Sequence, residues 1–363
     1  MKDLLHMKNR SILIVTLHLK NGGAERVFSE LMNSWANDGC NICVVQLCKD
    51  LIPGDNYKIS KGIEIINLET DHQYNSLLGK IEIIPKLVKL FKRKSDYTIL
   101  SFVNPATYLV AISSFFIKNK IVFSERCDPT HSPSNKFKRL LRTLAFYRAD
   151  ACVFQTVEAR NYFPNIIVNK STIIPNPIVS DLPYITYNNT TRIIMACTLN
   201  EQKNLKMAID AFSIVNKQNN ELYLDIFGQG NKYDEINNYI NDLGLNNKIH
   251  LKGYCTDIHK EMANSYLFLS SSNYEGISNS ILEAMAIGLP CICTDCPSGG
   301  TGMLIDDDVN GILVPVNNAL QMAKEIIRVI NNPDIYKKIS NNAKKVRNTY
   351  NIDDISKEWL KVV

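Results

Sequence analysis

Two glutamates eight residues apart have the chemistry to bind the hydroxyl groups of a sugar and of a ribose. They form the pattern Glu275-x7-Glu283, which follows an apolar run at 267–269 and overlaps a helical pattern at 280–287. Glu275 precedes a glycine in the loop after a buried strand, where α/β sheets place their ligands. The N–H groups at the start of the helix would face a phosphate. Glu283 has a second interpretation, because with Ser280 it fits the capping box Ser-x-x-Glu.

Two other loops could hold phosphate. Lys203 lies between a strand-like run at 192–196 and a helical pattern at 205–215. A cation and backbone amides at that helix N-terminus could share a diphosphate, although a solvated lysine is equally compatible with the spacing. Gly22 and Gly23 also stand between a strand and a helix. The dinucleotide fingerprint Gly-x-Gly-x-x-Gly is absent, so a simple tight turn remains the alternative there.

The first half of the chain carries a charged cluster and a basic amphipathic helix. The cluster Ser124-Glu125-Arg126 leads into the pattern at 135–148, which contains no acidic residue. Apolar residues at helical spacing there suit either an anionic membrane surface or an ordinary core. The expected membrane- or acceptor-facing cations are Lys136, Lys138, Arg139 and Arg142. A second basic stretch at 80–94 has six Lys or Arg residues and one Glu.

Charge is distributed unevenly along the 363 residues. Residues 1–180 have a net charge of +9 and residues 181–363 a net charge of −4, giving +5 overall. The basic half suggests an anionic partner: nucleic acid, a membrane surface or a phosphorylated substrate. With 45% hydrophobic and 21% charged residues, the composition excludes a disordered or low-complexity chain.

Metal binding is not expected. The ten cysteines show no pair of Cys-x2-Cys units at zinc-finger spacing, so we interpret them as reduced, mostly buried thiols. Asp306-Asp307-Asp308 precedes Val-Asn-Gly in a turn-like loop, which is a weak metal pattern.

The elements that must position these residues alternate between strand-like and helix-like periods, which predicts parallel sheets and an α/β class. We expect two Rossmann-like, doubly wound domains at 1–180 and 181–340, with a cleft between them. A C-terminal helix at 341–363 would pack back on the first domain. The longest uncharged apolar run, 106–117, is shorter than the roughly 20 residues of a membrane-spanning helix. The N-terminus lacks a cleavage-site pattern, so a cytoplasmic location is expected.

The ordered motifs resemble a known enzyme family. Asn-Gly-Gly-Ala-Glu-Arg, Ser-Glu-Arg-Cys-Asp-Pro, Pro-Asn-Pro-Ile, Gln-Lys-Asn, Phe-Gly-Gln-Gly, Leu-Lys-Gly and Glu-x7-Glu occur in this order. Together they resemble glycosyltransferase family 4, the retaining enzymes with the GT-B fold, and most closely those that build capsule, O-antigen or other lipid-linked glycans. The resemblance implies transfer of a hexose or N-acetylhexosamine from a UDP-sugar to a lipid-linked saccharide. It also implies a peripheral position on the cytoplasmic face of the inner membrane, without a nucleic-acid partner.

The resemblance also implies roles for individual residues. Lys203 would hold the donor diphosphate, Glu283 the ribose, and Glu275 the transferred sugar. Fixed positive groups would replace a metal ion, so no cofactor is expected. The remaining donor-binding residues that it implies are Gly22, Gly23, Thr198, Gly228, Tyr254, Gly276, Ile277, Ser278 and Asn279.

Two departures from the family pattern matter. Cys197-Thr198-Leu199 stands where the family has Gly-Arg-Leu, so a diphosphate-binding arginine is missing. Arg126 stands where many members have a histidine, and it or His131 could take over the missing function. Reduced activity is the other outcome. Two alternatives to a transferase also stay open. One is a nucleotide-sugar epimerase of the same fold, and the other is a protein that binds nucleotide sugars without catalysis.

Overall fold

The chain forms two separate units in the computed structural model. It describes residues 10–19, 22–48, 58–68, 70, 72, 76–102, 104–179, 181–186 and 191–363. The first unit combines Met1–Pro177 with Ile352–Val363, and the second is Ile178–Asn351. The division therefore falls three residues before the expected one, and residues 341–351 stay with the second unit instead of the first.

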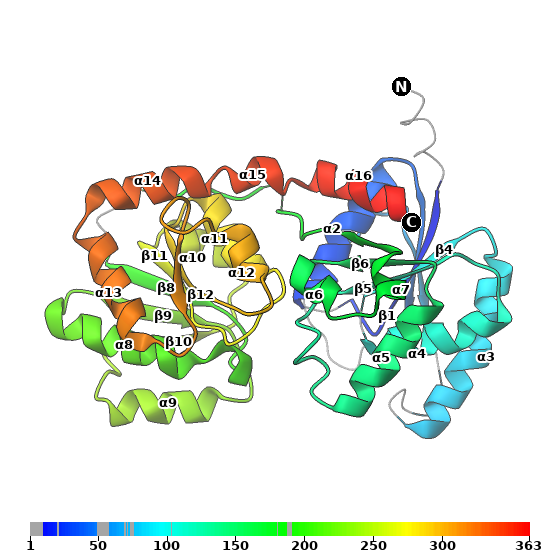
Figure 1. The fold of residues 1–363 in the computed structure, drawn as a ribbon, viewed down its shortest axis with the longest axis horizontal. Helices are drawn as coiled ribbons and strands as arrows, with labels where there is room; N and C mark the ends of the chain where they lie inside the picture. Colours follow the sequence, from blue (N-terminus) through cyan, green and yellow to red (C-terminus); the bar gives the residue numbers. More distant parts are fainter. Residues whose placement is uncertain are drawn as a thin grey trace. The chain divides into compact units, whose positions relative to one another are not determined.

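The first unit, coloured from blue to green in Figure 1 with its last helix in red, contains a parallel seven-stranded sheet with the order β3-β2-β1-β4-β5-β6-β7. Its strands are β1 Ser11–Thr16, β2 Asn41–Gln46, β3 Glu64–Asn67, β4 Thr98–Ser101, β5 Ile121–Glu125, β6 Ala151–Phe154 and β7 Ser171–Ile173. Its helices are α2 Gly23–Asn37, α3 Leu77–Arg93, α4 Asn104–Ser113, η1 Ser114–Phe116, α5 Lys136–Arg148, α6 Val157–Asn161, α7 Asn165–Val168 and α16 Ile352–Val362. The inner strands are continuous apolar runs because helices cover both faces of the sheet.

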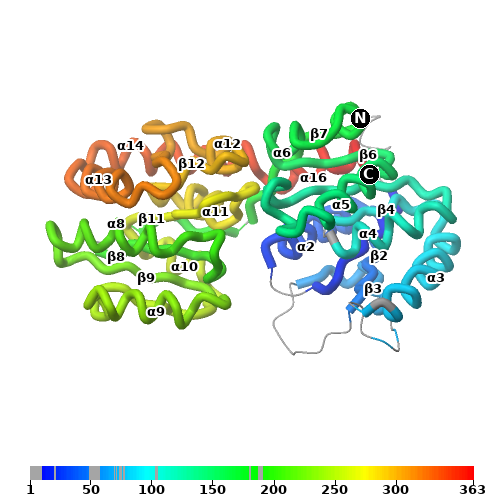
Figure 2. The backbone as a smooth tube through the Cα atoms, turned by 60° about the horizontal axis from the view of Figure 1, so that its bottom comes forward, coloured from blue at the N-terminus to red at the C-terminus, as the bar shows by residue number. Residues whose placement is uncertain are grey.

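The two faces of this sheet pack into separate apolar cores. On one face α3, α4 and α5 lie side by side, as Figure 2 shows. On the other face α16 packs against α2, and the indole rings of Trp35 and Trp359 are fully buried with their centroids 6.5 Å apart. The ring of Phe102 lies 5.1 Å from that of Trp359. The C-terminal helix is thus part of the hydrophobic core of the first unit.

The second unit contains a parallel six-stranded sheet with the order β10-β9-β8-β11-β12-β13. Its strands are β8 Arg192–Ala196, β9 Tyr223–Phe227, β10 Ile249–Gly253, β11 Leu267–Ser270, β12 Cys291–Asp295 and β13 Ile312–Pro315. Its helices are η2 Glu201–Lys203, α8 Leu205–Gln218, α9 Tyr233–Asp242, α10 Ile258–Ala263, α11 Asn279–Ile287, α12 Gly300–Leu304, α13 Ala319–Ile330, α14 Pro333–Ala343 and α15 Val346–Thr349. The strand order reverses direction at β8, and β11 lies on its other side. In parallel sheets this reversal is where ligands bind.

The expected α/β class and two Rossmann-like domains are confirmed. Three short strands escaped the sequence analysis, namely β3, β7 and β13, and each is an edge strand. The side chains of β3 are mostly exposed, so its sequence lacks a buried apolar run. Within the described ranges, no helix combines the length and apolar character needed to cross a membrane.

Candidate functional site

Glu275 is buried in the loop that follows β11, at the carboxyl edge of the second sheet. Its side chain is 8% exposed and accepts hydrogen bonds from the Ser272 hydroxyl at 2.7 Å and the Gln202 amide at 3.2 Å. Ser298 holds the backbone on both sides, because its hydroxyl accepts from the Glu275 N–H and donates to the Glu275 carbonyl. The carboxylate is therefore held in one orientation by surrounding donors.

Lys203 forms an ion pair with Glu275 across the loops that follow β8 and β11. Asn204 places it there: its backbone is left-handed (φ 44°) and its amide donates to the side chains of Asn273 at 2.9 Å and Asn317 at 2.8 Å. Burial lowers the pKa of Lys203, but attraction to Glu275 outweighs this effect and leaves the pKa above its ordinary value. The lysine is therefore charged at neutral pH, and the structure brings together two of the three expected catalytic side chains, Lys203 and Glu275.

The N-terminus of α11 adjoins this pair. The expected phosphate-binding residues Gly276, Ile277, Ser278 and Asn279 form the turn into the helix. Ser278 is the N-cap residue, but its side chain makes no capping bond to the helix N–H groups. A small cavity between the ends of β8 and β11 is lined by the ammonium-bearing Lys203 and by hydroxyls that include those of Ser278 and Ser280. Cationic and N–H donors thus face the same region.

Glu283 lies on α11, where it is 4% exposed, and pairs with His259. The Nε2 atom of His259, on α10, lies 2.9 Å from the Glu283 carboxylate. The capping-box interpretation is not supported, because α11 begins at Asn279 with Ser278 as its cap, which puts Ser280 inside the helix. His259 could not be predicted from the sequence, because it lies 24 residues before its partner and belongs to no motif.

The other expected donor residues of the second unit surround the same sheet edge. Thr198 is exposed in the loop after β8, and Tyr254 is half exposed directly after β10. Gly228 has φ 138° and lies against the backbone carbonyl of Cys197, where a side chain would collide. Gly228 therefore permits the close approach of the loops that follow β8 and β9, which is a structural role.

In the first unit, Gly22 directly precedes α2 and Gly23 is the first residue of that helix. Gly22 is the N-cap position, and the carboxylate of Glu25 lies where a Gly22 side chain would project. Burial raises the pKa of Glu25. Glu25 thus occupies the region that was expected to approach phosphate, and Asn21, the first residue of this motif, lies outside the described residues.

Arg126 is a buried cation at the carboxyl end of β5, with 8% of its surface exposed. Its guanidinium donates to neutral oxygens of Asn176 and Ile174 and lies 5.8 Å from the ring centroid of Trp359. Burial lowers the pKa of Arg126 to about 9. Its expected catalytic role stays a prediction.

Arg142 does not lie on the surface, which corrects the expected set of membrane-facing cations. Its side chain is fully buried, pairs with Glu125 at 3.1 Å and donates to the Pro129 carbonyl at 3.0 Å. It therefore anchors α5 to the loop after β5. The other expected cations of α5 remain accessible: Lys136 and Lys138 are exposed and Arg139 is half-buried.

The expectation that no metal is needed stays a prediction. Among the described residues, no group of three or more His, Cys, Asp or Glu side chains is arranged to hold a metal ion. Within the 306–308 triplet, Asp307 accepts from the Leu313 N–H at 2.8 Å and Asp308 pairs with Arg328. All ten cysteines are free thiols.

Comparison with known proteins adds a family match. The family described as "Glycosyl transferases group 1" matches residues 185–346, nearly the whole second unit. A Campylobacter jejuni protein named GalNAc-alpha-(1->4)-GalNAc-alpha-(1->3)-diNAcBac-PP-undecaprenol alpha-1,4-N-acetyl-D-galactosaminyltransferase is 22% identical over 98% of both chains. A poly(glycerol-phosphate) alpha-glucosyltransferase of Bacillus subtilis is 28% identical over 76% of this chain. The matched residues cover only 40% of the length of that enzyme.

Solved structures share the fold of the whole chain. HepE of Anabaena, solved in complex with UDP and glucose, has a TM-score of 0.80 at 19% identity, covering 97% of this chain and 99% of that one. Sucrose-phosphate synthase from Thermosynechococcus elongatus has a TM-score of 0.84 at 16% identity, covering 98% of both. The fold is therefore GT-B, and the family match together with these relatives supports a glycosyltransferase.

Proposed function

We propose that this protein is a retaining glycosyltransferase of family 4. It transfers a hexose or N-acetylhexosamine from a UDP-sugar to a hydroxyl of a lipid-linked saccharide, in the assembly of a capsule- or O-antigen-type polysaccharide. The observation that carries this proposal is the buried Lys203–Glu275 pair beside the N-terminus of α11.

The pair suits a reaction in which UDP leaves. Negative charge grows on the diphosphate as the bond to the sugar breaks, and fixed positive groups in a water-poor site stabilise it. Lys203 supplies a full charge, and the N–H groups that begin α11 supply partial charges. Because these groups belong to the protein, the proposed reaction needs no metal ion.

The two glutamates have separate tasks in this proposal. Glu275, at the entrance to α11, accepts hydrogen bonds from the transferred sugar. Glu283, one oxygen of which contacts His259, accepts from the ribose hydroxyls. A carboxylate that binds two neighbouring hydroxyls discriminates strongly against analogues that lack them, since a buried acceptor is then left unpaired.

A lipid-linked acceptor agrees with the surface of α5. Its apolar stripe is exposed, with Phe137 65%, Leu140 54% and Leu144 53% accessible, and so it is not the core face that the alternative interpretation required. An exposed apolar stripe flanked by lysines is typical of a helix at a membrane interface. We place α5 on the cytoplasmic face of the inner membrane, in keeping with the undecaprenol named in the C. jejuni relative.

The donor test uses calorimetric binding of UDP and a panel of UDP-sugars, followed by UDP release with and without acceptor lipid. Lys203→Ala should weaken UDP binding at least about tenfold, since charge-assisted phosphate contacts are strong. Lys206→Ala is the matched control, because Lys206 carries the same charge at the start of α8 but is 46% exposed and pairs with Glu235. Equal losses in both variants would contradict the assignment of the site.

The product distinguishes the remaining alternatives. Conversion of one nucleotide sugar into its epimer, without acceptor or UDP release, would identify the epimerase. Binding without turnover, unaffected by Glu275→Gln, would identify the non-catalytic protein. For the transferase, Glu275→Gln should mainly reduce kcat, and the anomeric proton coupling of the product should show retained configuration.

A further inference from the structure

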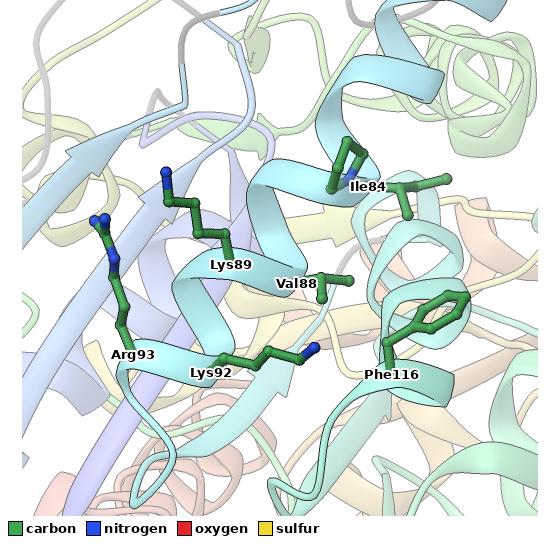
Figure 3. A pocket seen from close by; sticks show the side chains of 7 residues that line it. Ile84, Val88, Lys89, Lys92, Arg93 and Phe116 are labelled. Atoms are coloured by element: carbon green, nitrogen blue, oxygen red, sulfur yellow. The ribbon is translucent and has the colours of Figure 1, made fainter.

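An apolar groove runs between α3 and η1 of the first unit, on the face that also carries α5. Its volume is about 630 Å³, within the range of roughly 300–1,000 Å³ typical of small-molecule pockets. Figure 3 shows Ile84 and Val88 on one side of α3 with the ring of Phe116 opposite them, and Pro85 also lines the groove. The ring of Phe116 is 60% exposed although it is apolar. The groove therefore offers an apolar ligand a place that no side chain of the described residues fills.

The rim of the groove is cationic. Lys92 leaves α3 on the same side as Ile84 and Val88, and Lys89 and Arg93 extend from the other flank of the helix. None of the described residues that line the groove is acidic. Within the described part of the chain, none of these three cations has a carboxylate at ion-pair distance, whereas the neighbouring Lys94 pairs with Glu64 at 2.6 Å. Three clustered cations without counter-charges favour an anionic ligand.

The surface around the groove continues this combination of apolar and cationic groups. Phe115, beside Phe116 in η1, is 72% exposed, and the Arg148 guanidinium of α5 lies 5.6 Å from its ring centroid. Ile81, one turn before the groove on α3, is 57% exposed. Large exposed apolar side chains that gather on one face mark an interaction site. The groove and its surroundings thus form an amphipathic surface on elements distant in sequence from the Lys203 site.

We propose that this groove seats a hydrocarbon chain of an anionic membrane phospholipid. Val88, Ile84 and Phe116 contact the chain, Lys92 binds the phosphate of the same lipid, and Lys89 and Arg93 bind neighbouring headgroups. The inference rests on the membrane association in the proposed function and adds a defined single-lipid site to it. The charge pattern favours a lipid over an apolar protein helix, because a helix docked here would leave three cations uncompensated.

The test uses short-chain phosphatidylglycerol below its micelle concentration, so that binding to one lipid is separated from adsorption to a bilayer. Isothermal titration with the full-length protein should show saturable binding, weaker binding of phosphatidylcholine with the same chains, and no binding of glycerol phosphate. Phe116→Asp and Lys92→Glu should each weaken the binding of phosphatidylglycerol about tenfold or more. Leu320→Asp and Lys324→Glu are matched controls on α13, since Leu320 is 54% exposed and Lys324 is exposed.

A second variant reports on the groove directly. Phe116→Trp places an exposed indole at the groove, while the two native tryptophans are buried. Lipid with a brominated chain should quench it, and Lys92→Glu in the same protein should relieve the quenching. Equal effects of the control variants, equal binding of glycerol phosphate, or a dimer that forms through this face without lipid binding would overturn the inference.

Lipid binding by a protein that transfers no sugar would leave this inference standing and contradict the proposed function. Sugar transfer without lipid binding would contradict this inference and leave the proposed sugar transfer standing.

Discussion

Replacing Lys203 by methionine isolates the electrostatic role of the buried pair. Methionine keeps an unbranched chain of similar length but removes the cation, so the Glu275 carboxylate is left buried without its partner. Breaking a buried ion pair in this way typically costs about 3–5 kcal/mol. The hydroxyl of Ser272 at 2.7 Å and the amide of Gln202 at 3.2 Å still solvate the carboxylate. We therefore expect the lower end of that range, about 3 kcal/mol.

The double variant Lys203→Met/Glu275→Gln provides the decisive comparison. It removes both charges, so the free energy of unfolding should return to within about 1 kcal/mol of the original protein. At about 2–4 °C per kcal/mol for a domain of this size, Lys203→Met should lower the melting temperature of the second unit by about 6–12 °C. Both variants should bind UDP poorly, because both lack the cation.

Calorimetric unfolding at pH 7 and at high pH measures these effects. The pKa of Lys203 is raised in the folded state, so the stabilising charge is fully present below the ordinary value of 10.5 and is lost as the pH rises through the folded value. The difference between the original protein and Lys203→Met should therefore persist at pH 7 and shrink only above pH 10.5. The reasoning would be refuted if Lys203→Met were as stable as the original protein. It would also be refuted if the double variant were no more stable than Lys203→Met.

Three further predictions concern other parts of the chain. His259→Phe should raise KM for the UDP-sugar about three- to tenfold with little change in kcat, and should reduce discrimination against a 2′-deoxyribose donor, because phenylalanine keeps a ring but removes the nitrogen that contacts Glu283. An unchanged discrimination ratio would argue against a positioning role. Iodoacetamide at pH 8 should label the exposed Cys127 before Cys197, since burial raises the pKa of Cys197 to about 11, and mass spectrometry gives the order. Trp359→Ala should cost the first unit about 3–5 kcal/mol, and calorimetry that found the second unit destabilised instead would contradict this expectation.

Buried parallel strands could be predicted from the sequence, whereas three of the four edge strands, β3, β7 and β13, could not. Each inner strand, such as β5 or β12, is a short apolar run bounded by turn residues, and covered faces require that pattern. Strand β3 has only one half-buried side chain among four positions, so no periodic signal marks it. The edges are therefore set by pairing with a neighbour that the local sequence does not specify.

The candidate site shows the same limit. Glu275 and Lys203 could be predicted because each stands in a loop between an apolar strand and a helix. Arg142 and His259 could not, because their roles depend on partners outside any local pattern. Helical periodicity places Arg142 on a basic helix, but only the fold reveals that Glu125, in a neighbouring strand, draws it into the interior.

The position of α16 has a consequence for synthesis on the ribosome. Trp35 and Phe102 belong to the first part of the chain to be made, yet they pack against Trp359, which follows the entire second unit. Until α16 has been translated, these aromatic side chains lack their partner and expose apolar surface, which makes a nascent chain prone to aggregation. The second unit, which is continuous in sequence, can complete its core first. The first unit can therefore complete its hydrophobic core only after the second unit has been synthesised.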